Sequence, residues 1–158
     1  MSTFQMLRTF VDVCPQAVWE PRFFGFPYPV WYQAYHAAYF IDYWLQDDYR
    51  GERALCMTFD SRIPPEFEHG IPPDLSISKA EMQEYITLLH AKAARFFDRL
   101  TDRMLGTEIT ENTINLTYLD VVCGQNRHVM YNIGYLNAIL RSLNLEEADW
   151  YSYNEECE

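Results

Sequence analysis

Positive charge is scarce in this chain. Twelve Lys and Arg residues stand against 23 Asp and Glu residues, so the formal net charge is −11 over 158 residues. A surface this acidic repels phosphate backbones and anionic lipid headgroups. We therefore expect neither nucleic-acid binding nor binding to an anionic membrane surface.

Long apolar runs and paired cysteines are also missing. No apolar run approaches the roughly 18 residues of a membrane span, and residues 1–13 lack the basic region and apolar run of a signal peptide. The four cysteines form no Cys-x-x-Cys pair and no framework spacing, as is typical of reduced thiols: Cys14, Cys56, Cys123 and Cys157. These absences predict a soluble, cytoplasmic protein.

Several catalytic patterns are absent as well. The chain has no Gly-x-x-x-x-Gly-Lys loop, no Gly-x-Gly-x-x-Gly turn, and no Ser-His-Asp or Cys-His arrangement at recognisable spacing. What it does have is apolar and aromatic material, at 49% and 16% of residues. This composition predicts one folded domain with a proper core rather than intrinsic disorder.

The prolines divide the chain, because all eight fall within 15–29 and 64–73. Proline breaks helix interiors, so the proline-free stretches can hold long helices. Apolar spacing predicts helices near 3–13, 28–48, 78–104 and 117–143, with no sheet of consequence. The predicted fold class is therefore all-α: one four-helix-bundle domain spanning 1–158, up-down, with a long connection over 49–77 that wraps the bundle or carries function. An acidic tail covers about 145–158.

Local signals mark the later helices. Ser78 and Glu81 have the spacing of a capping box, and Thr117 is suited to cap the last helix. Gly124 and Gly134 fall inside that last helix, where each costs about 1 kcal/mol relative to alanine. Their presence predicts close packing at both positions.

Two histidines and an amide form the candidate site. His128 and Asn132 are four residues apart, so they share a helix face, and His36 on an earlier helix can reach the same point. A stripe containing Tyr32, Tyr39 or Phe40, and Tyr43, together with Tyr131 and Tyr135, is either core lining or the lining of such a pocket. Asp42 is about 120° away from the face of His36, which indicates a carboxylate at the surface or behind the site.

Two segments resemble a known family. Residues 35–45, with His36, resemble the second helix of DinB-like proteins, and residues 127–141, with His128 and Gly134, are similar to their late histidine helix. The resemblance implies a four-helix bundle, a homodimer, and a divalent metal held by one histidine of the second helix and two of the later helix. The matching metal positions here are His36, His128 and Asn132, so Asn132 replaces one of the three histidines. Tyr135 stands where a glutamine is common.

The replacement affects the implied chemistry. An amide oxygen is a weaker ligand than imidazole for zinc or nickel, so the resemblance implies at most a weakly bound Zn or Ni ion. One reading is a degenerate, stress-related member whose pocket binds a small ligand, such as a thiol, or a weakly held divalent metal. The other is a thiol transferase or hydrolase whose metal activates a thiol or water. Under either, replacing Asn132 with His should raise metal affinity at least tenfold.

Overall fold

A computed structural model describes residues 2–23, 28–46, 57–59, 62–67, 75–111 and 114–151. The fold is mostly helical, which confirms the all-α expectation at that level. In chain order the elements are α1 (Ser2–Val13), α2 (Gln16–Trp19), α3 (Val30–Trp44), α4 (Lys79–Arg99), α5 (Asp102–Leu105), β1 (Glu108–Glu111), β2 (Ile114–Thr117) and α6 (Tyr118–Ser142).

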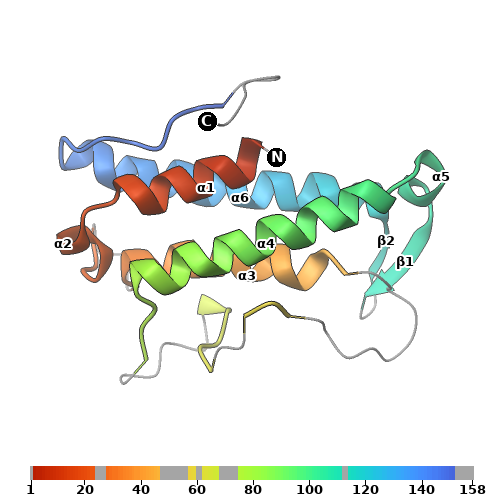
Figure 1. Cartoon of the computed structure of the whole chain (residues 1–158), viewed down its shortest axis with the longest axis horizontal. Helices are drawn as coiled ribbons and strands as arrows, with labels where there is room; N and C mark the ends of the chain where they lie inside the picture. Colours follow the sequence, from red (N-terminus) through yellow and green to blue (C-terminus); the bar gives the residue numbers. More distant parts are fainter. Residues whose placement is uncertain are drawn as a thin grey trace.

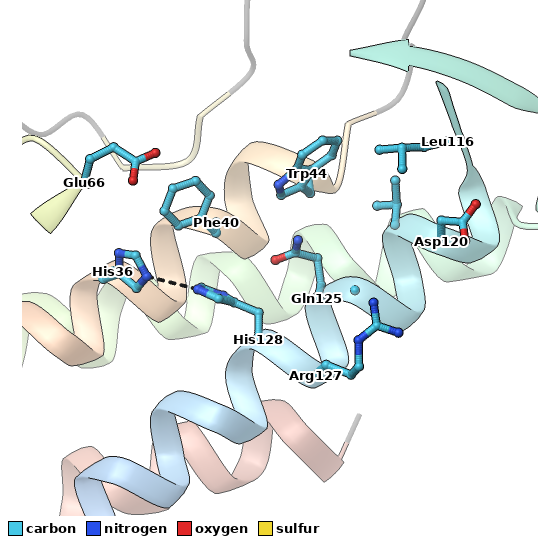
Figure 2. A pocket seen from close by; sticks show the side chains of 11 residues that line it. His36, Phe40, Trp44, Glu66, Leu116, Asp120, Gln125, Arg127 and His128 are labelled. Carbon is cyan, nitrogen blue, oxygen red and sulfur yellow. Dashed lines mark hydrogen bonds between the residues drawn. The ribbon is translucent and has the colours of Figure 1, made fainter. Parts of the chain in front are cut away.

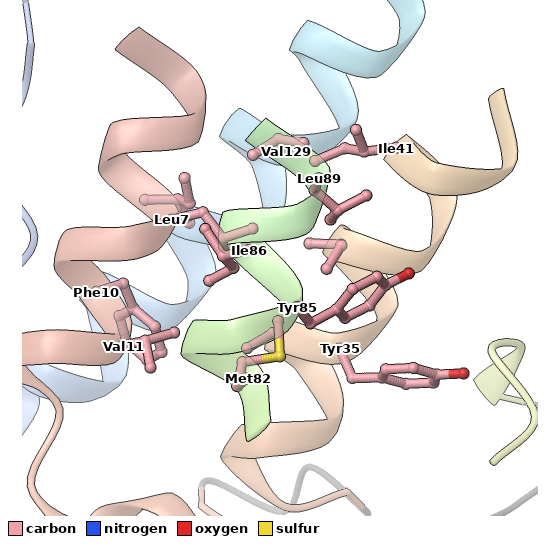
Figure 3. Close-up of a cluster of buried hydrophobic side chains, with 14 of the residues drawn as sticks. Leu7, Phe10, Val11, Tyr35, Ile41, Met82, Tyr85, Ile86, Leu89 and Val129 are labelled. Carbon is pink, nitrogen blue, oxygen red and sulfur yellow. The ribbon is translucent and has the colours of Figure 1, made fainter. Parts of the chain in front are cut away.

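Four longer helices, α1, α3, α4 and α6, run along the long axis of the molecule (Figure 1). Helix α6 contacts α3 and α1, and α4 contacts the same two helices from the other side. Their facing side chains form one hydrophobic core, to which α1 contributes Leu7 and Phe10 and α4 contributes Ile86 and Leu89 (Figure 3). This packing places α3 directly against α6, and the candidate histidines lie on those two helices.

The predicted caps of α4 and α6 are confirmed, whereas the helix expected over 28–48 begins at Val30 and ends at Trp44. Ser78 Oγ accepts a hydrogen bond from the Glu81 backbone N–H at 3.2 Å, and the Glu81 carboxylate accepts from the Ser78 N–H at 2.8 Å. Thr117 and Asp120 form the same reciprocal arrangement at the start of α6. Both capping boxes satisfy backbone donors that a helix N-terminus leaves free.

The helix expected over 78–104 is two helices. Leu100 takes an extended backbone conformation, with ψ of 126°, so α4 ends at Arg99. Thr101 then caps the short α5 by accepting from the Met104 N–H at 3.3 Å. A local capping residue thus interrupts an apolar period that continues across the break.

A two-stranded antiparallel hairpin precedes α6, although the sequence predicted no sheet of consequence. Ile109 in β1 pairs with Leu116 in β2. Each strand has only four residues, which is too short for a sustained alternation of apolar and polar side chains. The hairpin matters for the site because β2 leads directly into the cap of α6.

The prediction of close packing at Gly124 and Gly134 is wrong. A Cβ atom added at either position would meet no atom within 4 Å. Both glycines face open space on α6, so neither is required by a close approach.

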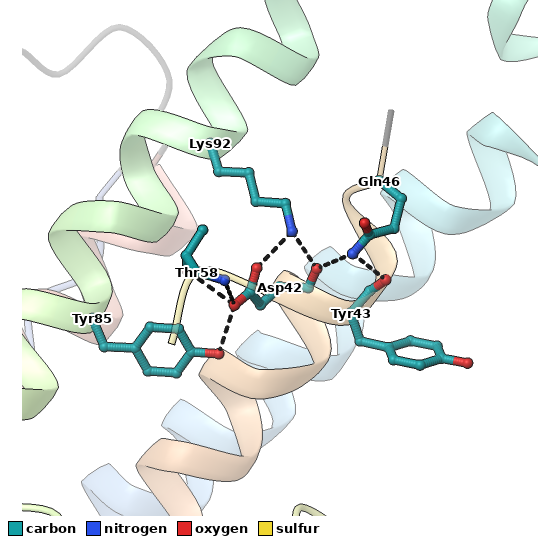
Figure 4. Close-up of polar contacts among 6 residues, drawn as sticks. All are labelled: Asp42, Tyr43, Gln46, Thr58, Tyr85 and Lys92. Carbon is teal, nitrogen blue, oxygen red and sulfur yellow. Dashed lines mark hydrogen bonds and ion pairs between the residues drawn. The ribbon is translucent and has the colours of Figure 1, made fainter. Parts of the chain in front are cut away.

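The prediction for Asp42 is also wrong. Its side chain is fully buried and forms an ion pair with Lys92 of α4 (Figure 4). Helical spacing gives the angle between Asp42 and His36 on α3 but says nothing about α4, which packs against α3 and supplies Lys92.

The cysteines, the tail and the helix lengths also bear on the predictions. Cys14 and Cys123 are free thiols, whereas Cys56 and Cys157 lie outside the described residues. The tail is held to the body by Tyr151, whose hydroxyl lies 3.1 Å from Thr9 Oγ1. Within the described residues, none of the helices combines the length and apolarity that crossing a bilayer demands.

Candidate functional site

His36 of α3 and His128 of α6 meet directly. Their Nε2 atoms are 3.0 Å apart, and the two rings face each other between the helices (Figure 2). The α3–α6 contact thus brings together two imidazoles that are 92 residues apart in the chain. One of the two facing nitrogens must carry a hydrogen for this contact to be attractive.

The proline-rich connection sets the tautomer of His36. Its Nδ1 atom is 2.8 Å from the carbonyl oxygen of Pro65, and its ring stacks on Phe67 at a centroid distance of 4.2 Å. A carbonyl oxygen only accepts, so Nδ1 carries the hydrogen and Nε2 of neutral His36 presents its lone pair. In this arrangement His128 Nε2–H donates to His36.

His128 is held in its neutral form. Burial, and next the neighbouring His36, lower the pKa of His128 to about 4. Its other nitrogen, Nδ1, is buried and has no hydrogen-bond partner within the described part of the chain. With the hydrogen on Nε2, this Nδ1 is an unpaired acceptor.

Asn132 does not join the two histidines. It is only 1% exposed, its Oδ1 accepts a hydrogen bond from Gln33 Nε2, and its Nδ2 donates to the His128 carbonyl oxygen at 2.7 Å. The amide oxygen expected to complete a metal site is therefore already bonded. Sequence reasoning missed Gln33, although Gln33 lies three residues before His36 and thus on the same face of α3.

The histidine pair lies in the wall of a cavity of about 480 Å³. Helix α3 and helix α6 supply most of the lining, and single residues come from β2 and from the connection (Figure 2). The lining residues are His36, Phe40, Trp44, Glu66, Leu116, Asp120, Val121, Gly124, Gln125, Arg127 and His128. The connection thus contributes Glu66 to the cavity and Pro65 to the orientation of His36.

The predicted tyrosines lie elsewhere. Among the described cavity-lining residues there is none of Tyr32, Tyr39, Tyr43, Tyr131 and Tyr135. Tyr32 is fully buried and donates to the Pro64 carbonyl at 2.5 Å, whereas Tyr131 is 76% exposed. The cavity face of α3 is instead His36, Phe40 and Trp44, one residue every four, so Phe40 and not Tyr39 has the predicted place.

The described lining contains more acidic than basic side chains. Asp120 is engaged in the α6 cap, where hydrogen bonds from the Thr117 hydroxyl and backbone N–H lower the pKa of its carboxyl group. Glu66 and Arg127 are the other charged residues of the lining. Among the described residues, the lining therefore combines two carboxylates and one guanidinium with a mostly apolar wall.

The metal site implied by the family resemblance fits these residues only in part. His36 has the arrangement usual for a metal-binding histidine, because its second nitrogen donates to a backbone carbonyl. His128 would have to move its hydrogen from Nε2 to Nδ1, where no acceptor is found among the described residues. The Asn132 oxygen is bonded to Gln33, so the full three-ligand set does not fit. In the same described residues, no group of three or more His, Cys, Asp or Glu side chains could hold a metal ion.

What these observations define is a mostly helical protein with a histidine pair in the wall of one cavity. No protein-family model matches the chain, and no curated protein matches it.

Proposed function

We propose that this protein is a DinB-like four-helix bundle whose cavity binds a small molecule. In this proposal the His36–His128 pair is a polar part of the ligand-binding wall and also a weak site for a divalent cation. The observation that carries it is the meeting of the two Nε2 atoms, 3.0 Å apart, in the wall of a cavity large enough for a small organic molecule.

The distance between the two imidazoles supports a cation site. Two nitrogens bound tetrahedrally to zinc, each about 2.0–2.1 Å from the metal, lie roughly 3.3 Å apart. The histidine rings would need to separate by only a few tenths of an ångström from their present contact. Because His128 is neutral well below pH 7, protons do not compete with a cation for its ring.

The same residues favour weak binding over a permanent metal centre. A bound cation would leave a buried N–H on His128 Nδ1 without an acceptor, and an unmade buried hydrogen bond costs about 1–3 kcal/mol. Two imidazoles are also one ligand short of the three that catalytic zinc sites use. A pocket that has the two histidines but no third metal ligand is better suited to binding a small molecule than to metal-based catalysis.

The second candidate is a metal-dependent thiol transferase or hydrolase. The hydrogen bond from His36 Nδ1 to Pro65 favours it, because this orientation presents Nε2 to a metal. In that case the metal would lower the pKa of a bound thiol or water. His36 and His128 would hold it, and the apolar wall around Phe40 and Trp44 would position the substrate.

Titration calorimetry with Zn²⁺ and with Ni²⁺, on protein purified without an affinity tag, tests the proposal. We expect one weak site per chain, and its loss in His128→Ala and in His36→Ala. His90→Ala is the matched control, because His90 is an exposed histidine of α4 whose ring contacts Phe4. Equal binding by the wild type and by both site variants would refute the cation site.

The metal content of the same preparation separates the two candidates. Stoichiometric metal retained without any added salt would favour the enzyme. Little or no retained metal, together with weak binding in the titration, would favour the binding protein.

We also propose a cytoplasmic homodimer that associates through helix faces. The family resemblance and the large exposed side chain of Tyr131 on α6 support it. Light scattering should give about twice the chain mass of 18.8 kDa. A mass of one chain across micromolar concentrations would refute the dimer.

A further inference from the structure

Buried hydrogen-bond acceptors without donors gather where α3 meets α6. Within the described residues, the buried side-chain atoms that lack a partner are Gln33 Oε1, Gln125 Oε1 and His128 Nδ1. The first two are amide oxygens, and the third is an acceptor in the tautomer that Pro65 and His36 impose. A buried acceptor left without a donor costs about 1–3 kcal/mol, so a ligand that supplied donors here would recover free energy.

Gln125 and His128, which carry two of these acceptors, both line the cavity, although the two atoms themselves are covered. The side chain of Gln125 extends from α6 toward the space beside Phe40 and Trp44 (Figure 2). No described residue donates to its Oε1. A turn of the Gln125 side chain toward the cavity would let a ligand with N–H or O–H groups donate to this oxygen.

The charges of the lining favour a cation. The Asp120 carboxylate accepts from the Thr117 N–H at 2.9 Å and from its hydroxyl at 2.7 Å, and Arg127 lies near enough to act on its charge. The Glu66 carboxylate is the acidic group of the lining that is available to a ligand, since no described side chain donates a hydrogen bond to it. Figure 2 shows this carboxylate directed toward Phe40. The net charge of −11 adds an attraction for cations over the whole surface.

The apolar part of the lining suits the body of an organic ion. Phe40 and Trp44 present aromatic rings one helical turn apart, and Leu116 and Val121 stand on the other elements. Aromatic faces attract ammonium groups and also pack well against hydrocarbon. A hydrated inorganic ion would make poor use of such a wall.

We propose that the cavity takes a small organic cation, a primary ammonium group carried on an aryl or alkyl body. Glu66 and the Gln125 amide oxygen accept hydrogen bonds from the ammonium, and Phe40 and Trp44 pack against the body. The inference rests on the proposed function, since it names the ligand class of the same cavity.

Three matched probes test the ligand class by calorimetry at pH 7: 2-phenylethylamine, which is protonated, 2-phenylethanol, which is neutral, and 3-phenylpropionate, which is an anion. We expect the amine to bind at least tenfold more tightly than the alcohol, and the anion not to bind measurably. Equal or tighter binding of the alcohol or the anion would overturn the cation, and the cavity would survive as a binding site. Failure of all three probes to bind would also overturn the proposal, whereas the metal titration tests the histidine pair separately.

Variants locate the binding. Glu66→Gln and Gln125→Leu should each lower affinity for the amine at least fivefold, and should change affinity for the alcohol less. Glu146→Gln is the control, because Glu146 is an exposed acidic residue outside the lining, and it should change neither affinity. Gly124→Phe should abolish binding of the amine, because Gly124 lines the cavity, a Cβ there meets no atom within 4 Å, and the added ring is expected to fill the open space. Gly134→Phe on the same helix is the matched control, since Gly134 has the same open space but does not line the cavity. Full binding by Gly124→Phe would overturn the assignment to this cavity.

Discussion

Lys92 Nζ lies 2.6 Å from Asp42 Oδ1 in the interior of the molecule, and a second bond of 2.7 Å joins it to the Asp42 backbone carbonyl. The Asp42 side chain is 0% exposed and Lys92 as a residue is 7% exposed. The other carboxylate oxygen accepts from Thr58, through both its N–H at 2.7 Å and its hydroxyl at 2.9 Å, and from Tyr85 (Figure 4). One carboxylate thus ties α3 to α4 and to the connection that also carries Pro65 and Glu66.

Removing the cation of this pair should be severely destabilising. Lys92→Met keeps most of the apolar stem but leaves the buried Asp42 carboxylate without its counter-charge. We expect a loss of about 3–5 kcal/mol in the free energy of unfolding, measured by urea denaturation. The double variant Asp42→Asn/Lys92→Met should recover part of the loss, because it removes the unpaired charge as well.

The ion pair between Arg141 and Glu147 is the control. Its charged atoms are 2.7 Å apart, but the Arg141 side chain is 73% exposed. Exposed pairs contribute little because solvent screens them and ordering two long side chains costs entropy. Arg141→Met should leave the urea midpoint almost unchanged. If Lys92→Met and Arg141→Met had equal effects, burial would not be what makes the Asp42–Lys92 pair important.

Gly134 offers a stabilising substitution. It lies inside α6, and a Cβ there meets no atom within 4 Å. Gly134→Ala should therefore raise the free energy of unfolding by about 1 kcal/mol through helix propensity alone. A thermal or urea melt measures it, and a destabilised variant would mean that a partner packs on this face.

The helices and their starts could be predicted because their causes are local. Each capping residue lies three positions before its partner: Ser78 before Glu81, and Thr117 before Asp120. Such a short segment of sequence contains the whole interaction. The break after Arg99 was missed because an apolar stripe continues past it while the backbone turns at Leu100. At such a point a capping residue favours a helix end while the spacing of apolar residues favours a continuous helix. The spacing alone does not determine where the helix ends.

The site could be predicted only in part. The convergence of His36 and His128 was expected mainly from the family resemblance, because the shared helix face joined only His128 and Asn132. The Gln33–Asn132 bond joins residues 99 positions apart, so no spacing rule reports it. Asp42 was misplaced for the same reason, since Lys92 and Tyr85 reach it from another helix. Residues that act through a neighbouring helix need the packing to be known.

Asn132 should contribute little to cation binding. Its oxygen is bonded to Gln33, so Asn132→Ala should change Zn²⁺ affinity less than twofold, whereas His128→Ala should abolish binding. The expected gain of tenfold for Asn132→His requires the new ring to replace the bond that Gln33 makes now. Calorimetry on these three variants decides the matter, and a large loss in Asn132→Ala would restore Asn132 as a ligand.

The last prediction concerns pH and His128. Burial lowers the pKa of folded His128 to about 4, from the 6.5 that is ordinary for a histidine in an unfolded chain. Between these two values the unfolded chain binds a proton that the folded chain does not, so stability falls as the pH is lowered from 6.5 to 4. The NMR signal of the His128 ring should accordingly show no titration between pH 8 and pH 5. In urea melts over the same range, His128→Leu should lose stability less steeply on acidification than the wild type. A ring of His128 that titrates near pH 6.5 would mean that the histidine pair is open to solvent, and the case for an anchored, neutral pair in the cavity wall would fail.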